Sequence, residues 1–205
     1  MTENAMIQEA LLALEGDNVN ARASAIETLA EEGYTPAVPQ IVKILLDADP
    51  GTTFIAAKAL GRLADQQAVP ALLDTLRGND IWVRAAVTGA LIQIGTPAIE
   101  GLTDALRDED KAVRRAAAKA LGKIGELGDD DRVQRGLSSA LLDVDDGVRR
   151  FAAEALGRLK ATSMVSELTE ALDDQNAEVR IAAFKALANF KTPEAQKAVR
   201  QWVRE

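Results

Sequence analysis

The residue types that most often carry out chemistry in proteins are scarce in this chain. It has no histidine and no cysteine, so it lacks the usual general base, the thiolate nucleophile and the commonest zinc ligands. The one dense group of carboxylates is Asp129–Asp131, and it has neither the alternating spacing nor the distal Glu of a calcium loop. We therefore expect no catalytic residue and no metal site. A solvated insertion is the favoured interpretation of Asp129–Asp131, and a metal loop is the alternative.

A second group of side chains could bind a partner. These residues recur four positions apart within separate segments, a spacing that places them together on one face of a helix. Eight basic residues share these positions with three acids, although the whole chain carries a net charge of −8. A basic strip in an acidic protein favours an anionic or mixed partner surface, and an ordinary solvated helix face is the alternative. The candidate residues are Phe54, Lys58, Arg62, Trp82, Gly89, Arg115, Lys119, Lys123, Arg150, Arg158 and Lys185.

The segment around Trp82 differs from the others. Its inward positions are small, and Gly89 costs roughly 1 kcal/mol relative to Ala inside a helix. With Phe54 one repeat away, these residues could form a shallow apolar notch beside the basic strip, and exposed aromatic residues are typical anchors of interfaces. The alternative is that Trp82 packs on the next turn and Gly89 relieves crowding.

The elements that must position these residues are repeats. An Ala-Leu pair recurs with its leucine at Leu29, Leu60, Leu91, Leu121, Leu156 and Leu187, about 31 residues apart. Three more columns recur at the same spacing: a second leucine column, an Asp or Asn column suited to cap a helix, and an arginine column that Thr53 interrupts. An arginine can pair with the capping acid of its own repeat or of a neighbour, for ~0.2–1 kcal/mol if exposed. A glycine after the Ala-Leu pair (Gly61, Gly122, Gly157) leaves room for the next layer. Such periodicity predicts stacked helix pairs.

The predicted fold is an all-α, right-handed α-solenoid of about six helix pairs plus a C-terminal capping helix, in a single domain over residues 1–205. Aromatic residues are few, so Leu, Ala, Val and Ile must build the core. In such arrays the second helix of each pair, helix B, lines the concave face. The expected repeats are 4–33, 35–64, 66–95, 97–125, 131–160 and 162–190, with the cap at 193–205. The expected B helices are Val19–Glu32, Thr52–Ala64, Ile81–Ile94, Ala112–Ile124, Gly147–Leu159 and Ala177–Phe190.

The motif D-x-x-V-R-x-x-A-A-x-A-L-G-x-I/L, carried by Asp110–Ile124 and Asp145–Leu159, resembles the short HEAT-like repeat of the phycobilin lyases. The resemblance covers nearly the whole chain and implies several functions. They include bilin attachment by paired E/F-type lyase subunits, phycobilisome turnover and general scaffolding. A di-iron deoxyhypusine hydroxylase also shares the repeat, but its iron is held by His-Glu pairs, which this chain lacks.

Two functions stay open. The first is a non-catalytic scaffold that binds a protein partner on the concave helix-B face and needs no cofactor. The second is a subunit of a phycobilin lyase or another phycobilisome-handling factor, with a phycobiliprotein subunit or a sister repeat protein as partner and a non-covalently held bilin. The acidic balance argues against nucleic acid as a partner. The N-terminal residues have no signal-peptide pattern, and apolar runs are short, so we expect no membrane partner and a cytoplasmic location.

Overall fold

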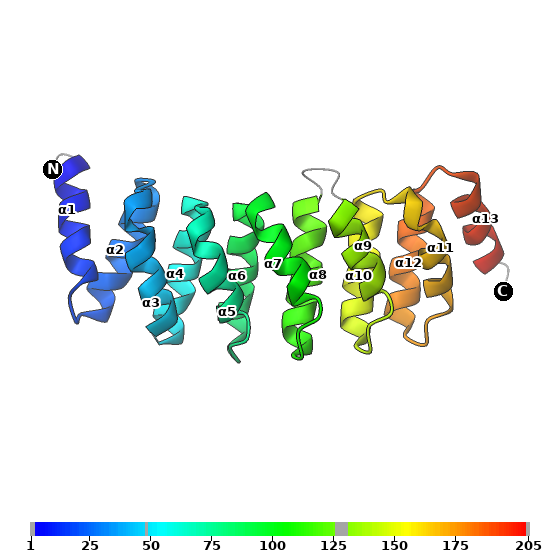
Figure 1. Ribbon diagram of the computed structural model, residues 1–205, viewed down its shortest axis with the longest axis horizontal. Coiled ribbons are helices and arrows are strands. Elements are labelled where there is room, and N and C mark those ends of the chain that lie inside the picture. Colours follow the sequence, from blue (N-terminus) through cyan, green and yellow to red (C-terminus); the bar gives the residue numbers. More distant parts are fainter. Residues whose placement is uncertain (1–2, 48, 126–130, 204–205) are drawn as a thin grey trace. The chain divides into compact units, whose positions relative to one another are not determined.

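The structure is a computed structural model that describes residues 3–47, 49–125 and 131–203 (Figure 1). Contacts within the chain divide it into two compact units, Met1–Gly101 and Leu102–Glu205, which are described separately. Helices make up most of the described ranges, and no β-strand occurs in them. The architecture is an all-α solenoid of helix pairs, as the repeat predicted. The single domain expected over residues 1–205 stays a prediction.

The first unit contains three pairs of helices and the beginning of a fourth. Each pair packs one helix A against the following helix B, and the B helices α2, α4 and α6 are consecutive neighbours (Figure 1). The helices are α1 (Glu3–Leu14), α2 (Val19–Glu31), α3 (Val38–Asp47), α4 (Pro50–Leu63), α5 (Val69–Thr75) and α6 (Ile81–Ile94), and the unit ends within α7 (Ile99–Ala105).

The second unit repeats this arrangement. Its B helices α8, α10 and α12 pack in series, and α13 packs against α11 and α12. At the end of the unit, Trp202 stacks on Phe184 with ring centroids 4.9 Å apart and donates its Nε1–H to the carbonyl of Leu172 at 3.2 Å. The helices are α8 (Lys111–Ile124), α9 (Asp131–Ala140), α10 (Asp146–Arg158), α11 (Val165–Glu170), α12 (Ala177–Asn189) and α13 (Pro193–Trp202).

Helix boundaries follow the predicted columns closely. Each predicted capping side chain accepts a backbone N–H two or three residues further along and so begins a B helix. A single 3₁₀ turn, such as Thr96–Ala98, precedes several of the A helices. The confirmed caps are Asn18, Asp49, Asp80, Asp110, Asp145 and Asn176.

Within each unit, the core lies between the helices of each pair and between neighbouring pairs. All six leucines of the Ala-Leu column are fully buried. The predicted role of the glycines is confirmed, because a Cβ on Gly122 would lie 3.0 Å from the Cα of Ala155 and one on Gly157 would lie 2.9 Å from the Cα of Ala186. B helices therefore approach closely where glycine meets alanine.

Two further predictions concern the acidic group Asp129–Asp131 and membrane-spanning helices. Of the acidic group, Asp129 and Asp130 lie outside the described residues, and Asp131 begins α9. Over the ranges given above, every helix is too short or too polar to cross a lipid bilayer.

Candidate functional site: the helix-B face of the second unit

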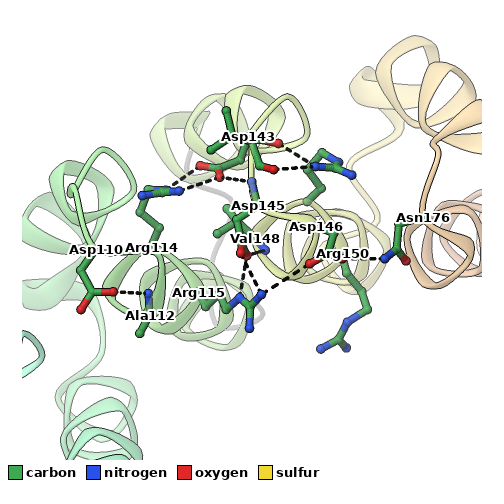
Figure 2. A network of polar contacts seen from close by, with 12 residues as sticks. Asp110, Ala112, Arg114, Arg115, Asp143, Asp145, Asp146, Val148, Arg150 and Asn176 are labelled. Atoms are coloured by element: carbon green, nitrogen blue, oxygen red, sulfur yellow. Dashed lines mark hydrogen bonds and ion pairs between the residues drawn. The ribbon is translucent and has the colours of Figure 1, made fainter. Parts of the chain in front are cut away.

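In the second unit, the arginine column joins successive repeats. In Figure 2 the guanidinium of Arg114 donates from Nε and Nη2 to the two carboxylate oxygens of Asp143, at 2.8 and 3.0 Å. Its Nη1 donates to the carbonyls of Asp108 and Glu109, at 2.8 and 3.0 Å. Arg114 is buried and Asp143 is largely buried, with 11% of each side chain exposed.

The next repeat uses the same arrangement. Arg149 donates from Nε and Nη2 to Asp174 at 2.7 and 2.9 Å, and from Nη1 to the carbonyls of Asp143 and Val144. The hydrogen bonds from Arg149 hold the pKa of Asp174 below its ordinary value, and the same contacts raise the pKa of the Arg149 guanidinium. Each arginine thus links the turn of its own repeat to the turn of the next.

The prediction that this arginine column pairs with the capping acid was wrong. Sequence spacing suggested the capping acid. The carboxylates of Asp110 and Asp145 instead accept hydrogen bonds from backbone N–H groups at the start of α8 and α10. The observed partner is an acid two residues before the cap, Asp143 or Asp174. A six-residue separation between this acid and the arginine of its own repeat recurs in the sequence, so the column could have been found there.

Arg115, predicted to face a partner, belongs to a second contact between repeats. Its Nε and Nη2 donate to Asp145 at 2.6 and 2.8 Å, and Nη2 lies 3.4 Å from Asp146 (Figure 2). Hydrogen bonding to Arg115 lowers the pKa of Asp145. The Arg115 side chain remains 40% exposed, but its charge is offset within the chain. It can orient a partner and supplies little net positive charge.

The remaining predicted residues of this unit lie on α8, α10 and α12. Lys119 and Lys123 are exposed on α8. Arg150, Arg158 and Lys185 line one groove between α10 and α12, with a volume of ≈ 480 Å³. The structure therefore brings these three predicted residues together.

The α10–α12 groove combines charged walls with an apolar patch. Its floor includes Gly157 and Ala186 at their close approach, and Ile181 lies in the groove with 46% of its surface exposed. Glu154 accepts from Arg150 at 2.8 Å, and Glu178 lies 3.3 Å from the same side chain. Sequence reasoning did not select Ile181 or Glu178 as site residues. In the sequence, Ile181 is an apolar residue at the position that Arg115 and Arg150 occupy in other repeats. This difference could have identified it.

In the first unit, the predicted residues occupy α4 and α6. Lys58 lies over the half-buried ring of Phe54, 5.5 Å from its centroid, and Arg62 forms an exposed pair with Glu31 at 3.5 Å. Trp82 is 72% exposed, beside Ile81 at 70%. The interpretation that Trp82 packs on the next turn is therefore wrong. Gly89 faces open space, since a Cβ placed there would meet nothing within 4 Å.

These features define a class of protein in which stacked helix pairs present ordered side chains along the B helices. The sequence pattern of HEAT repeats matches residues 7–92, 69–139 and 134–205. The chain therefore belongs to the HEAT-repeat family. No curated protein matches the sequence.

Solved structures agree on the fold. A structure of microtubule plus-end tracking by XMAP215, CLIP-170 and EB1 is 19% identical, with a TM-score of 0.66 over 88% of this chain and 89% of that chain. A designed armadillo repeat protein in complex with the peptide (KR)4 is 19% identical, with a TM-score of 0.54 over 93% and 100%. The complex of CpcE and CpcF of phycocyanin lyase from Nostoc sp. PCC7120 is 26% identical, with a TM-score of 0.57 over 74% and 98%.

Proposed function

We propose that the chain is a non-catalytic scaffold that binds a protein partner on the helix-B face of Leu102–Glu205, with the α10–α12 groove at its centre. The observation that carries the proposal is that the exposed Ile181 lines one groove together with the cationic side chains of Arg158 and Lys185. An exposed apolar residue in a groove with charged walls fits an interface, in which a buried apolar centre is surrounded by a polar rim.

The charges of this face favour a partner of mixed character. Arg115 and Arg150 are paired with acids of the chain itself. Lys119 and Lys185 are exposed and form no ion pair with another described residue, so they are available to carboxylates of a partner. Glu154 and Glu178 add negative charge to the groove. A helix or loop that inserts one apolar side chain between acidic residues, with a basic residue near Glu178, fits this arrangement.

An apolar notch in the first unit gives a second contact within the same proposal. Ile81 and Trp82 are exposed side by side at the start of α6, and Gly89 leaves open space two turns further along. Tryptophan is among the residues that contribute most binding energy when a partner covers it. We expect Trp82→Ala to weaken partner binding and to leave folding unchanged, because the side chain buries little surface in the chain itself.

The test compares two charge-matched double variants as bait in extracts of the source cells. Lys119→Glu with Lys185→Glu reverses two charges of the helix-B face, and Lys191→Glu with Lys197→Glu makes the same change near the capping helix α13. The proposal predicts that one protein is recovered by the wild type and by the α13 variant. We expect the helix-B variant to bind this protein at least about tenfold more weakly, which corresponds to a loss of ~1.4 kcal/mol or more of binding free energy. Equal recovery by both variants would contradict the proposal.

A second candidate function is that of a phycobilin lyase subunit or another phycobilisome-handling factor. The likeness to the CpcE–CpcF complex supports it, because it extends over 98% of that chain. A basic groove would also suit the propionate groups of a bilin that is held without a covalent bond. Visible absorption of the captured complex distinguishes the two candidates. Bilin colour or a sister repeat protein favours the lyase, and a colourless complex with another protein favours the scaffold.

A further inference from the structure

A pocket in the first unit contains an arginine whose hydrogen-bonding capacity is unused. It lies between α1, α2 and α3 and has a volume of ≈ 520 Å³. Two cations, Arg22 from α2 and Lys43 from α3, line it. The rest of the lining consists of Leu14, Glu15, Gln40, Ile44 and Asp47. The Nε of Arg22 is buried and has no hydrogen-bond partner. Leaving a buried charged donor without an acceptor is costly, so this group favours binding an acceptor from elsewhere.

Two other repeats show a carboxylate acceptor at this position, whereas Arg84 of the same column donates from Nε to the carbonyl of Leu76. Arg22 stands in the same column as Arg114 and Arg149, and both of these bind a carboxylate through Nε and Nη2. The planar fork of a guanidinium matches the two oxygens of a carboxylate. The chain thus uses this arginine position twice as a carboxylate receptor.

The acid that corresponds to Asp143 and Asp174 in this repeat is Asp47. It follows Arg22 by 25 residues, the separation that joins Arg149 to Asp174. No ion pair joins Arg22 to Asp47, although both line the pocket. The helices give a reason. Helix α9 ends at Ala140, three residues before Asp143, whereas α3 continues through Asp47, so the Asp47 carboxylate projects from a helix rather than from a turn.

We infer that this pocket binds a carboxylate of a partner polypeptide on Arg22, in the place that Asp143 and Asp174 take on their arginines. Lys43 contributes a second positive charge, and Leu14 and Ile44 supply apolar contact for the stem of the incoming residue. Glu15 and Asp47 leave the lining without a net charge, so recognition rests on the guanidinium fork of Arg22. The pocket lies on α1–α3 and shares no residue with the α10–α12 groove. The inference therefore stands apart from the proposed function.

The experiment is a titration of the ¹⁵N-labelled full chain with sodium acetate, followed through the arginine Nε–H signals. Arg22→Lys identifies the Arg22 signal. We expect this signal to move downfield along a saturating curve in acetate and not in sodium chloride of equal ionic strength. The signals of Arg114 and Arg149, which already hold carboxylates, serve as internal controls and stay in place. Lys43→Gln should raise the acetate concentration needed for half-saturation.

Two peptides then distinguish the sources of the carboxylate. One is capped at both ends and contains a single Glu, and the other has a free C-terminal carboxylate and no acidic side chain. A shift of the Arg22 signal by either peptide supports the inference and names the source. The inference is overturned if acetate moves the signal no further than chloride does, or if neither peptide moves it. It is also overturned if the free protein already shows a downfield Arg22 signal that Asp47→Asn abolishes, because Asp47 would then fill the place.

Discussion

Replacing Asp143 by alanine should destabilise the second unit more than any exposed charge does. The change removes two acceptors from the buried guanidinium of Arg114 and one acceptor from the backbone N–H of Asp145, at 2.8 Å. Breaking a buried ion pair by deleting one partner costs about 3–5 kcal/mol. Nη1 of Arg114 keeps its two carbonyl acceptors, so the lower end, ~3 kcal/mol, is expected for Asp143→Ala.

The matched control is Glu178→Ala in the same unit. Glu178 pairs with Arg150 at 3.3 Å, but 76% of its side chain is exposed, and exposed pairs contribute under about 1 kcal/mol. The assay is urea unfolding followed by circular dichroism, with amide hydrogen exchange of α8 and α10, because repeat arrays can depart from two-state unfolding.

A double variant separates the lost pair from other effects of Asp143→Ala. Arg114→Met with Asp143→Ala removes the uncompensated charge, so it should be more stable than Asp143→Ala alone. If Asp143→Ala costs no more than Glu178→Ala, then water satisfies Arg114 and the reasoning about the buried ladder is refuted.

Three other expectations concern acid stability and helix packing. Because the pKa of Asp174 is lower in the folded chain than in the unfolded chain, its contribution is present at neutral pH and is lost as the pH falls below about 5. Asp174→Asn should therefore lower stability at pH 7 and flatten its decline in acid, as measured by urea unfolding at a series of pH values. Gly61→Ala should destabilise the first unit by ~1–3 kcal/mol through overpacking, because its Cβ would lie 2.8 Å from the Cα of Ala90. Gly89→Ala, in open space on the next B helix, should instead stabilise it by up to ~1 kcal/mol in thermal unfolding.

Much of the fold was predictable from sequence because its determinants are local or strictly periodic. Capping acids such as Asp80 and Asp110 act on backbone groups two or three residues away. The Ala-Leu column repeats at a spacing that places Leu121 and Leu156 in equivalent positions of the core. These signals need no knowledge of the neighbouring repeat, and the structure confirmed them.

The candidate site was predicted less well because its charges are set by contacts between repeats. The sequence analysis expected Arg115 to face a partner. In the structure it pairs with Asp145, which lies 30 residues away in the sequence. Arg62 likewise pairs with Glu31 across 31 residues. Counting charges on one helix cannot show this compensation. The four-residue spacing still selected Arg158 and Lys185 for one face of adjacent B helices, and both line the α10–α12 groove.

The most direct test of the central claim is site-specific photocrosslinking of the α10–α12 groove. A photoreactive benzoylphenylalanine replaces Ile181 in one sample and the exposed Gln196 of α13 in the other. Both are irradiated in extract of the source cells, and crosslinked peptides are identified by mass spectrometry. The account predicts a crosslink from position 181 to one defined segment of a single protein, and none from position 196. Crosslinking to that protein from position 196 alone, or no product at position 181 above the level at position 196, would contradict it.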